Sequence, residues 1–425
     1  MSAIPAFNPL DPAFIADPYP FYHKLRALAP VWQSPLGMWI VTRNADAAVV
    51  LKDRRFGKNY AGSIIKSYGP DAMNEPARAS LGRTMLVLDP PDHTRLRGLV
   101  TKAFTARRVE DMRPRIAAIV DQLIDRVEAQ GHMDVIKDFA HRLPIIVICD
   151  MLGIPAEDQE QFFERSRVNG RLIDPVPMSR EELDVANANT LETNAYFESL
   201  FERRRREPRD DLTTKLVHAE EEGDRLTSDE LTANVGLLFA AGHETTANLI
   251  GNGLLALHRN PDQWDMMKAD PSLIPNAMEE LLRFDSSVQL TGRSTNTEVE
   301  LAGVKIPAGE SVVCFLGAAN RDPAVYPDPD KLDITRKDIW PMSFGGGIHH
   351  CLGAQLTRIE AQEAFAGLLR RLPGLRLPEK DAPQWRRSFT LRGLTTCNYS
   401  PPQLRNGATG DLEARKCCGA MQIRL

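Results

Sequence analysis

The chain has 425 residues, 43% of them hydrophobic, which is enough to bury a sizeable core in one large domain or two ordinary ones. Its 52 basic and 57 acidic residues give a net charge of −5, which argues against nucleic acid or an anionic membrane as the main partner. The N-terminus has neither the basic nor the apolar stretch of a secretory signal. No run of roughly 18 apolar residues predicts a membrane span.

The predicted elements begin with a strand at residues 37–43 and a helix at residues 44–53, with Asn44 placed as its cap. Residues 57–92 are rich in Gly, Pro and polar side chains and predict a longer irregular stretch. From residue 91 to residue 259 the pattern is overwhelmingly helical.

Short strands are predicted between residues 288 and 313, and helix returns after Cys351. The fold class is therefore mainly α with a small β subdomain. No internal repeat or low-complexity linker divides the chain. Residues 1–400 predict a single domain, and residues 401–425 predict an atypical polar tail that is expected to be disordered.

The cysteines are scattered and form no Cys-x-x-Cys pair, which disfavours a disulfide framework and a structural zinc site. A reducing cytoplasm is therefore the expected location. The six positions are Cys149, Cys314, Cys351, Cys397, Cys417 and Cys418.

One predicted helix is unusually long. The sequence from Thr227 to Glu230 is a capping box, and the apolar pattern then continues to Arg259. About 32 residues at 1.5 Å each would span nearly 50 Å, enough to cross a domain. Its middle, Ala241-Gly-His-Glu-Thr-Thr246, places a carboxylate and two hydroxyls in a helix that should be buried, so these groups need a purpose or a partner.

The strongest motif is Phe344-Gly-Gly-Gly-Ile-His-His-Cys-Leu-Gly353. Glycines let a backbone fold closely beneath a flat ligand, and a thiol at the start of a helix has a lowered pKa. The motif resembles the haem-binding loop of the cytochrome P-450 family, Phe-Gly-x-Gly-x-His-x-Cys-x-Gly, at every fixed position. An inert buried cysteine in a glycine turn is the alternative interpretation.

The resemblance implies a cytochrome P-450 fold that holds haem b between the long central helix and the helix after Cys351. Cys351 would be the axial thiolate and the metal ligand, and it would favour O–O cleavage. Neither a bound flavin domain nor an iron–sulfur cluster is expected. Phe344, Gly345, Gly353 and Ala241 would also contact the cofactor.

In the same family the long central helix carries an acid followed by an alcohol, here Glu244 and Thr245. These catalytic residues would deliver protons to oxygen by way of water and a hydroxyl. Gly242 would let the helix widen beside the iron. The alternative is a kinked buried helix whose hydroxyls bond back to the preceding turn. A zinc-protease motif, His-Glu-x-x-His, fails because position 247 is Ala.

Two further sets of residues match the family. Glu280 and Arg283 lie three apart on a predicted helix and can pair, and Arg336 matches the arginine that joins them. This trio would be buried and structural. The haem propionates would be bound by His93 and Arg97, which lie four apart on one helix face, and by Arg293 and His349. For any one of these residues, a solvated surface position is the alternative.

The resemblance covers most of the chain, from about residue 17 to residue 396. It implies a monooxygenase that activates O2 and inserts one oxygen atom into an apolar organic substrate, by hydroxylation or epoxidation. A peroxide-driven peroxygenase of the same fold, or a haem sensor or electron carrier, would not need the acid and alcohol pair. The apolar pocket would be lined by Leu238, Ala241, Val288, Leu290, Thr390 and Leu391.

Electrons would come from NAD(P)H through a ferredoxin reductase and an acidic ferredoxin. The enzyme is expected to be a monomer, with no nucleic-acid or membrane partner. Lys102, Arg107, Arg108 and Arg358 could form a basic docking patch, although ordinary solvated charge explains them equally well. The C-terminus departs from the family. A short apolar strand usually follows a segment like residues 391–396, whereas here a polar extension begins at Cys397.

Overall fold

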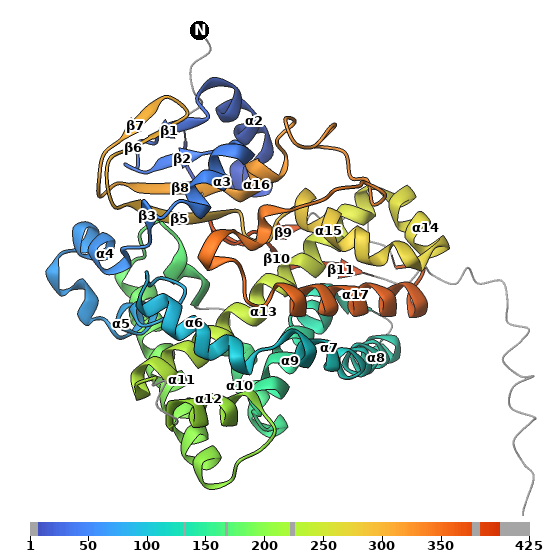
Figure 1. Ribbon diagram of the computed structural model, residues 1–425. Coiled ribbons are helices and arrows are strands. Elements are labelled where there is room, and N and C mark those ends of the chain that lie inside the picture. Colours follow the sequence, from blue (N-terminus) through green and yellow to red (C-terminus); the bar gives the residue numbers. More distant parts are fainter. Residues whose placement is uncertain (1–6, 131, 166–168, 222–225, 376–382, 400–425) are drawn as a thin grey trace, which may run out of the picture.

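The computed structural model describes residues 7–130, 132–165, 169–221, 226–375 and 383–399 (Figure 1). The tail at residues 401–425, with Cys417 and Cys418, lies outside the described residues. Helices fill most of the molecule, and a small sheet with three adjoining helices occupies one corner, at the upper left of Figure 1. The predicted mainly α fold with a small β subdomain is confirmed.

The helices are α1 (Pro12–Ala16), α2 (Tyr19–Leu28), α3 (Asn44–Lys52), α4 (Tyr60–Tyr68), α5 (Pro76–Gly82), α6 (Asp92–Ala103), α7 (Ala106–Asp111), α8 (Arg113–Gln130), α9 (Arg142–Leu152), α10 (Gln159–Arg165), α11 (Arg180–Arg206), α12 (Leu212–Glu221), α13 (Ser228–Arg259), α14 (Pro261–Ala269), α15 (Ile274–Phe284), α16 (Leu316–Asn320) and α17 (Ala354–Arg371). Short 3-10 or π turns lie at Pro70–Asn74, Val135–Ala140, Ala156–Asp158, Asn169–Ile173, Pro271–Leu273, Met342–Phe344 and Gly347–His349.

The strands are β1 (Val31–Gln33), β2 (Trp39–Val41), β3 (Phe56–Gly57), β4 (Met133–Asp134), β5 (Leu290–Thr295), β6 (Val299–Leu301), β7 (Val304–Ile306), β8 (Ser311–Phe315), β9 (Gln384–Trp385), β10 (Leu394–Thr396) and β11 (Asn398–Tyr399). Five of them form the main sheet in the order β1-β2-β8-β5-β3, in which only β2 and β8 run parallel. Pairing of β11 with β4 continues the β structure to Tyr399, beyond the point where the family pattern was expected to stop.

Side chains alternate between the two faces of the main sheet. Val312 and Cys314 of β8 belong to one core cluster, whereas Val313 and Phe315 belong to another. This period of two is what a strand imposes, and it buries both faces of β8. The sheet is therefore a rigid layer between two small cores, and a third, larger core lies among the helices.

Two predictions for the N-terminal part were wrong in detail. Asn44 does not cap α3 with its side chain, which instead donates to the carbonyl of Ala319. The carboxylate of Asp322 takes that place by accepting a hydrogen bond from the Asn44 N–H at 2.9 Å, so the cap comes from a distant segment. The stretch at residues 57–92 is less irregular than expected, because it contains α4 and α5.

The long central helix was predicted correctly. α13 runs from Ser228 to Arg259, and both hydrogen bonds of the capping box form between Thr227 and Glu230, at 2.8 and 3.2 Å. Most of its side chains are buried, and it crosses the molecule behind α17 in Figure 1. A helix that is buried on nearly all sides can hold functional groups at a fixed depth.

Where α13 packs against α17, polar groups meet in the interior. The hydroxyls of Thr246 and Thr357 lie 3.2 Å apart, and the Glu360 carboxyl is buried on the same side of α17, with 1% of the residue exposed. Burial raises the pKa of Glu360 to about 8, although Thr246 opposes the shift. Glu360 is therefore mainly protonated at neutral pH.

Replacing Glu360 by Gln is expected to make folding stability less dependent on pH. The folded state keeps the Glu360 proton up to its pKa of about 8, whereas the unfolded chain loses it near 4.5, so wild-type stability falls as pH rises between these values. Glu360→Gln removes this loss, which amounts to about 3 kcal/mol at pH 7. Urea unfolding midpoints between pH 5 and 8 measure the difference.

A matched control is Glu363→Gln on the same helix, because the Glu363 carboxylate lies at the partly exposed edge of α17 and pairs with Arg113 at 2.8 Å. This variant should keep the wild-type fall in stability toward pH 8. If the urea midpoint changed equally with pH in wild type and in Glu360→Gln, the buried carboxyl would not remain protonated in the folded state.

Candidate active site

The cysteine loop, residues 342–353, is a closed turn between the end of the sheet region and α17. Gly345 and Gly347 have φ values of +67° and +66°, in the left-handed region that favours glycine. A side chain at Gly347 would also collide with the carbonyl oxygen of Leu51. The Cys351 N–H donates to the Phe344 carbonyl at 3.0 Å and closes the loop. These glycines are therefore required by geometry.

Cys351 lies three residues before α17, so the helix begins slightly later than the predicted start at residue 352. Burial raises the pKa of the Cys351 thiol, while the Gly353 N–H and the charges of Arg97 and Arg358 lower it. The Arg97 guanidinium also donates to the His350 carbonyl at 2.6 Å. The loop thus offers a thiolate one backbone donor and two nearby cations.

An accessible stripe runs along one side of α13, although most of this helix is buried. Ala241 is exposed, and Leu237 and Thr245, four residues before and after it, are partly exposed. Residues four apart share a helix face. Cys351 is also accessible although protein atoms surround it closely. The stripe and the cysteine thus both keep accessible surface that protein atoms do not cover.

The acid and the alcohol on α13 have different partners. The Glu244 carboxylate is buried and pairs with Arg386, Oε1 to Nη1, at 2.5 Å. Burial raises the pKa of Glu244, and the charge of Arg386 opposes the increase. The Thr245 hydroxyl donates to the Ala241 carbonyl at 3.1 Å. Arg386, just after β9, was not anticipated because no motif marks it.

The helix widening expected at Gly242 is not seen, because α13 is a continuous α-helix from Ser228 to Arg259. Gly242 instead lets α9 approach closely: a Cβ placed there would lie 3.4 Å from the Ile148 side chain. The Thr245 hydroxyl bonds back within the helix, as the alternative interpretation expected.

Five nitrogen-bearing side chains, one of them from the cysteine loop itself, lie close together. His93 and Arg97 come from α6, Arg293 from β5 and His349 from the loop, and Lys58, which follows β3, joins them. The His93 and His349 rings lie 4.3 Å apart. Burial, followed by the charges of Lys58 and Arg293, lowers the pKa of His349 to about 2. Four of these five residues stand in motifs that the sequence shows, and Lys58 does not.

This cluster fits the two carboxylates of a haem. Both ring nitrogens of His93 are buried without a hydrogen-bond partner in the described chain, so a ring N–H is available to an acceptor that the protein does not supply. Arg293 is 5% exposed, and burial lowers the pKa values of Arg97 and Arg293. Buried cations that stand close together require an anion, and a propionate pair provides one.

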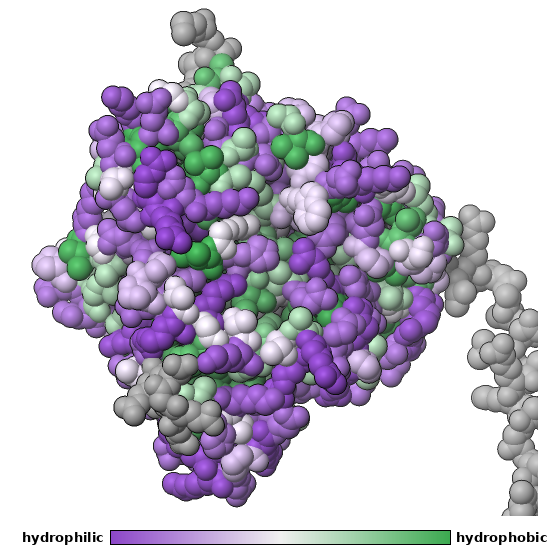
Figure 2. All heavy atoms as spheres, viewed as in Figure 1, coloured by the Kyte–Doolittle hydropathy of each residue, from purple (hydrophilic) through white to green (hydrophobic). Residues whose placement is uncertain are grey.

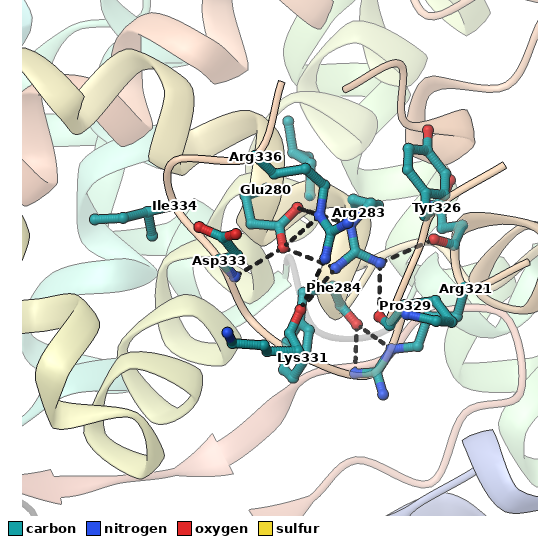
Figure 3. A network of polar contacts seen from close by, with 12 residues as sticks. Glu280, Arg283, Phe284, Arg321, Tyr326, Pro329, Lys331, Asp333, Ile334 and Arg336 are labelled. Atoms are coloured by element: carbon teal, nitrogen blue, oxygen red, sulfur yellow. Dashed lines mark hydrogen bonds and ion pairs between the residues drawn. The ribbon is translucent and has the colours of Figure 1, made fainter. Parts of the chain in front are cut away.

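The predicted structural trio comes together in the interior (Figure 3). Glu280 and Arg283 form two hydrogen bonds of 2.7 Å, and both side chains are 0% exposed. Arg336 approaches the same carboxylate at 3.3 Å. Arg283 also donates to the carbonyls of Asn320 and Pro329, so its buried charge is well satisfied.

Two residues connect this trio to the cysteine loop. The Asn320 side chain accepts from the Met342 N–H at 2.6 Å and donates to the Ser343 hydroxyl at 2.9 Å. That hydroxyl in turn donates to the Leu282 carbonyl at 2.7 Å. The start of the cysteine loop is therefore fixed to α15 and α16. Neither Asn320 nor Ser343 stands in a motif that the sequence reveals.

The predicted pocket residues have different surroundings. Leu290 lies directly opposite Phe315 in the sheet and packs with it in a core cluster. Val288 is partly exposed and pairs with Leu391 through an isolated bridge. The Thr390 hydroxyl lies 2.8 Å from the Asp174 carboxylate. Leu238, which is 9% exposed, lies three residues before Ala241 of the accessible stripe.

Among the residues that the structure describes, no helix has the length and apolar character needed to cross a membrane.

Comparison with known proteins identifies the family. The family model "Cytochrome P450" matches residues 27–391, and the chain therefore belongs to the cytochrome P450 family. Members are haem enzymes with an axial cysteine thiolate, and this chain is a P450 monooxygenase.

Bacterial relatives match over nearly their whole length. The chain is 44% identical to cytochrome P450 107B1 of Saccharopolyspora erythraea, over 94% of this chain and 98% of that protein. It is 43% identical to vitamin D(3) 25-hydroxylase of Pseudonocardia autotrophica, over 90% of this chain and 93% of that one.

Solved structures agree. CalO2 has a TM-score of 0.87 at 37% identity, over 93% of this chain and 98% of that one. P450BioI in complex with an acyl carrier protein ligated to hexadec-9Z-enoic acid has a TM-score of 0.85 at 38% identity, over 92% of this chain and 100% of that one.

Proposed function

We propose that this chain uses a haem held by Cys351 to insert one atom of O2 into an apolar organic substrate, by hydroxylation or epoxidation. The haem, when bound, supplies the oxygen-activating chemistry. The observation that carries the proposal is the position of Cys351. It lies on a glycine-built loop before α17 with the Gly353 N–H directed to its sulfur, and it keeps accessible surface inside the fold.

The protein around the sulfur stabilises its thiolate form. The Gly353 N–H and the charges of Arg97 and Arg358 stabilise the thiolate over the thiol. Arg358 is held in place by Glu279, at 2.5 and 3.0 Å, and by the face of the Phe344 ring, 4.6 Å away. Arg358 is therefore built into the environment of the cysteine rather than free on the surface.

We assign proton delivery to Glu244 and Thr245. Burial raises the pKa of Glu244 and so favours its protonated form, whereas the ion pair with Arg386 favours the carboxylate. Glu244 must therefore leave Arg386, at least briefly, to carry a proton to the oxygen side. The Thr245 hydroxyl, on the accessible stripe, would pass it on.

Two observations support an apolar organic substrate: the accessible stripe of α13 and the ligands named for related proteins. Leu237, Ala241 and Leu238 give this part of α13 an apolar surface, as ligand pockets commonly have. A related P450 is named as a vitamin D(3) 25-hydroxylase, and related structures contain myristic acid or testosterone. These molecules are largely apolar but differ widely in shape, so they support the class and not one compound.

For electron delivery we propose an acidic ferredoxin, reduced by an NAD(P)H-dependent reductase. Of the four candidate residues, Arg108 pairs with Asp210 and Arg358 with Glu279, so we centre the proposed docking patch on Arg107. Lys102 and Arg107 are exposed at the end of α6 and in α7. Figure 2 shows hydrophilic side chains interspersed with apolar ones over this part of the molecule.

The first prediction here concerns the iron ligand. Cys351→Ser should lose the Soret band that marks a thiolate-ligated haem in the reduced carbon monoxide complex, because serine cannot supply sulfur. Cys149→Ala, which removes a buried cysteine of α9, should keep that band. A thiolate-type spectrum in Cys351→Ser would mean that another residue holds the iron.

The second prediction concerns proton delivery. Thr245→Ala should raise the ratio of hydrogen peroxide released to product formed by about tenfold or more, since the relaying hydroxyl is lost. Thr245→Ser keeps a hydroxyl and should remain near wild type. Myristic acid and testosterone serve as first probes, chosen by the spin-state shift that they induce. Tight coupling in Thr245→Ala would contradict the assignment.

The third prediction concerns the redox partner. Arg107→Glu should slow reduction by an acidic ferredoxin several-fold at low ionic strength, and the difference should shrink at high salt because exposed charges are screened. Stopped-flow reduction in carbon monoxide measures the rates. The patch has no role if wild type and variant show the same salt dependence.

A further inference from the structure

We infer that Lys58 is an additional anchor for the haem, and that its ammonium group binds a propionate carboxylate beside Arg293. The inference rests on the proposed haem site. It adds a residue that stands in no recognised motif and comes from a different part of the chain than the other anchors.

The position of Lys58 follows from the sheet. In the antiparallel pair of β3 and β5, Phe56 lies opposite Thr295 and Gly57 opposite Ser294. The same register places Lys58 opposite Arg293, the next residue of the pair. The Lys58 ammonium donates to the Gly292 carbonyl at 3.2 Å. An ammonium has three donors, so this single contact leaves room for a further acceptor.

The backbone around Lys58 is held firmly. The Asp89 carboxylate accepts hydrogen bonds from the N–H groups of Lys58 and Asn59, at 2.8 to 3.1 Å. The Asp89 carbonyl accepts from the N–H of His93 at 3.0 Å. One residue therefore connects the Lys58 segment to the start of α6, which carries His93 and Arg97. This is a built position and not that of a mobile surface lysine.

The charges in the cluster call for an anion. With Lys58 protonated, Lys58, Arg97 and Arg293 carry three positive charges and Asp89 carries one negative charge, which leaves a net charge of +2. The two histidines add little, because burial lowers the pKa of both. Two propionates carry −2 and would balance the cluster, whereas without Lys58 one negative charge would remain unmatched.

The lowered pKa of Lys58 is consistent with a missing carboxylate beside it. Burial and the charge of Arg293 lower the pKa of Lys58 to about 7 in the protein alone. A carboxylate at hydrogen-bond distance would reverse this shift and keep the ammonium charged. A substrate carboxylate shares this chemistry with a propionate, so the test uses substrate-free enzyme, in which the propionates are the relevant carboxylates.

The experiment compares Lys58→Met with wild-type holoenzyme. Haem transfer to excess apomyoglobin should become roughly tenfold faster, since a charge-assisted contact is lost. The reduction potential of the iron should become more negative, because a nearby positive charge favours the reduced state. Lys58→Gln, a second neutral variant, should shift both quantities in the same direction.

Two controls separate charge from general damage. Lys58→Arg keeps the positive charge and should stay near wild type in both measurements. Lys66→Met removes a lysine that lies 69% exposed on α4, beside Glu310, and should change neither quantity. Unchanged haem transfer and potential in both neutral Lys58 variants would overturn the inference. The thiolate-type carbon monoxide spectrum is recorded throughout, and its absence in wild type would instead refute the proposed haem-thiolate site.

Discussion

The structure depends on an ion pair in its interior, Glu280 with Arg283. Two unscreened charges at this depth are stable only when nearly every donor and acceptor is satisfied. Arg283 meets this condition through Glu280 and through three backbone carbonyls, those of Asn320, Pro329 and Lys331. The Asn320 carbonyl ends α16, whereas Pro329 and Lys331 lie outside any helix or strand, so the guanidinium joins a helix end to irregular chain.

That constraint reaches the cysteine through a short series of hydrogen bonds. Arg283 holds the backbone of Asn320, whose side chain holds Met342 and Ser343 at the start of the cysteine loop. From there the left-handed glycines turn the chain back so that the Cys351 N–H reaches the Phe344 carbonyl. The sulfur is thereby placed by contacts that lie well outside the loop itself.

Motifs were predictable from the sequence where spacing along one element sets the geometry. The capping box at Thr227 and Glu230 and the pairing of Glu280 with Arg283 are local in this sense. The packing of Leu290 against Phe315 could not be predicted, because the neighbours of a strand residue are set by its partner strand, which the sequence does not show. The cap of α3 came from Asp322, nearly 300 residues away, for the same reason.

Lys58 and Arg386 could not be found from the sequence, since each is a single polar residue on a short strand or turn. The role of each depends on a residue distant in the chain. Lys58 lies beside Arg293, and Arg386 pairs with Glu244. A lone lysine or arginine is normally a solvated surface group, so pattern reasoning correctly gives it little weight. Tertiary placement alone distinguishes these two.

The contact between Glu244 and Arg386 also connects the proposed proton-delivery residue to the turn that carries two predicted pocket residues. The Arg386 N–H donates to the Gly393 carbonyl at 2.9 Å, within the turn that carries Thr390 and Leu391. Asp174 binds Thr390 and also raises the pKa of Glu244 by its charge. Arg386 and Asp174 therefore act on the pKa of Glu244 in opposite directions, and both are held by contacts with the segment that carries Thr390 and Gly393.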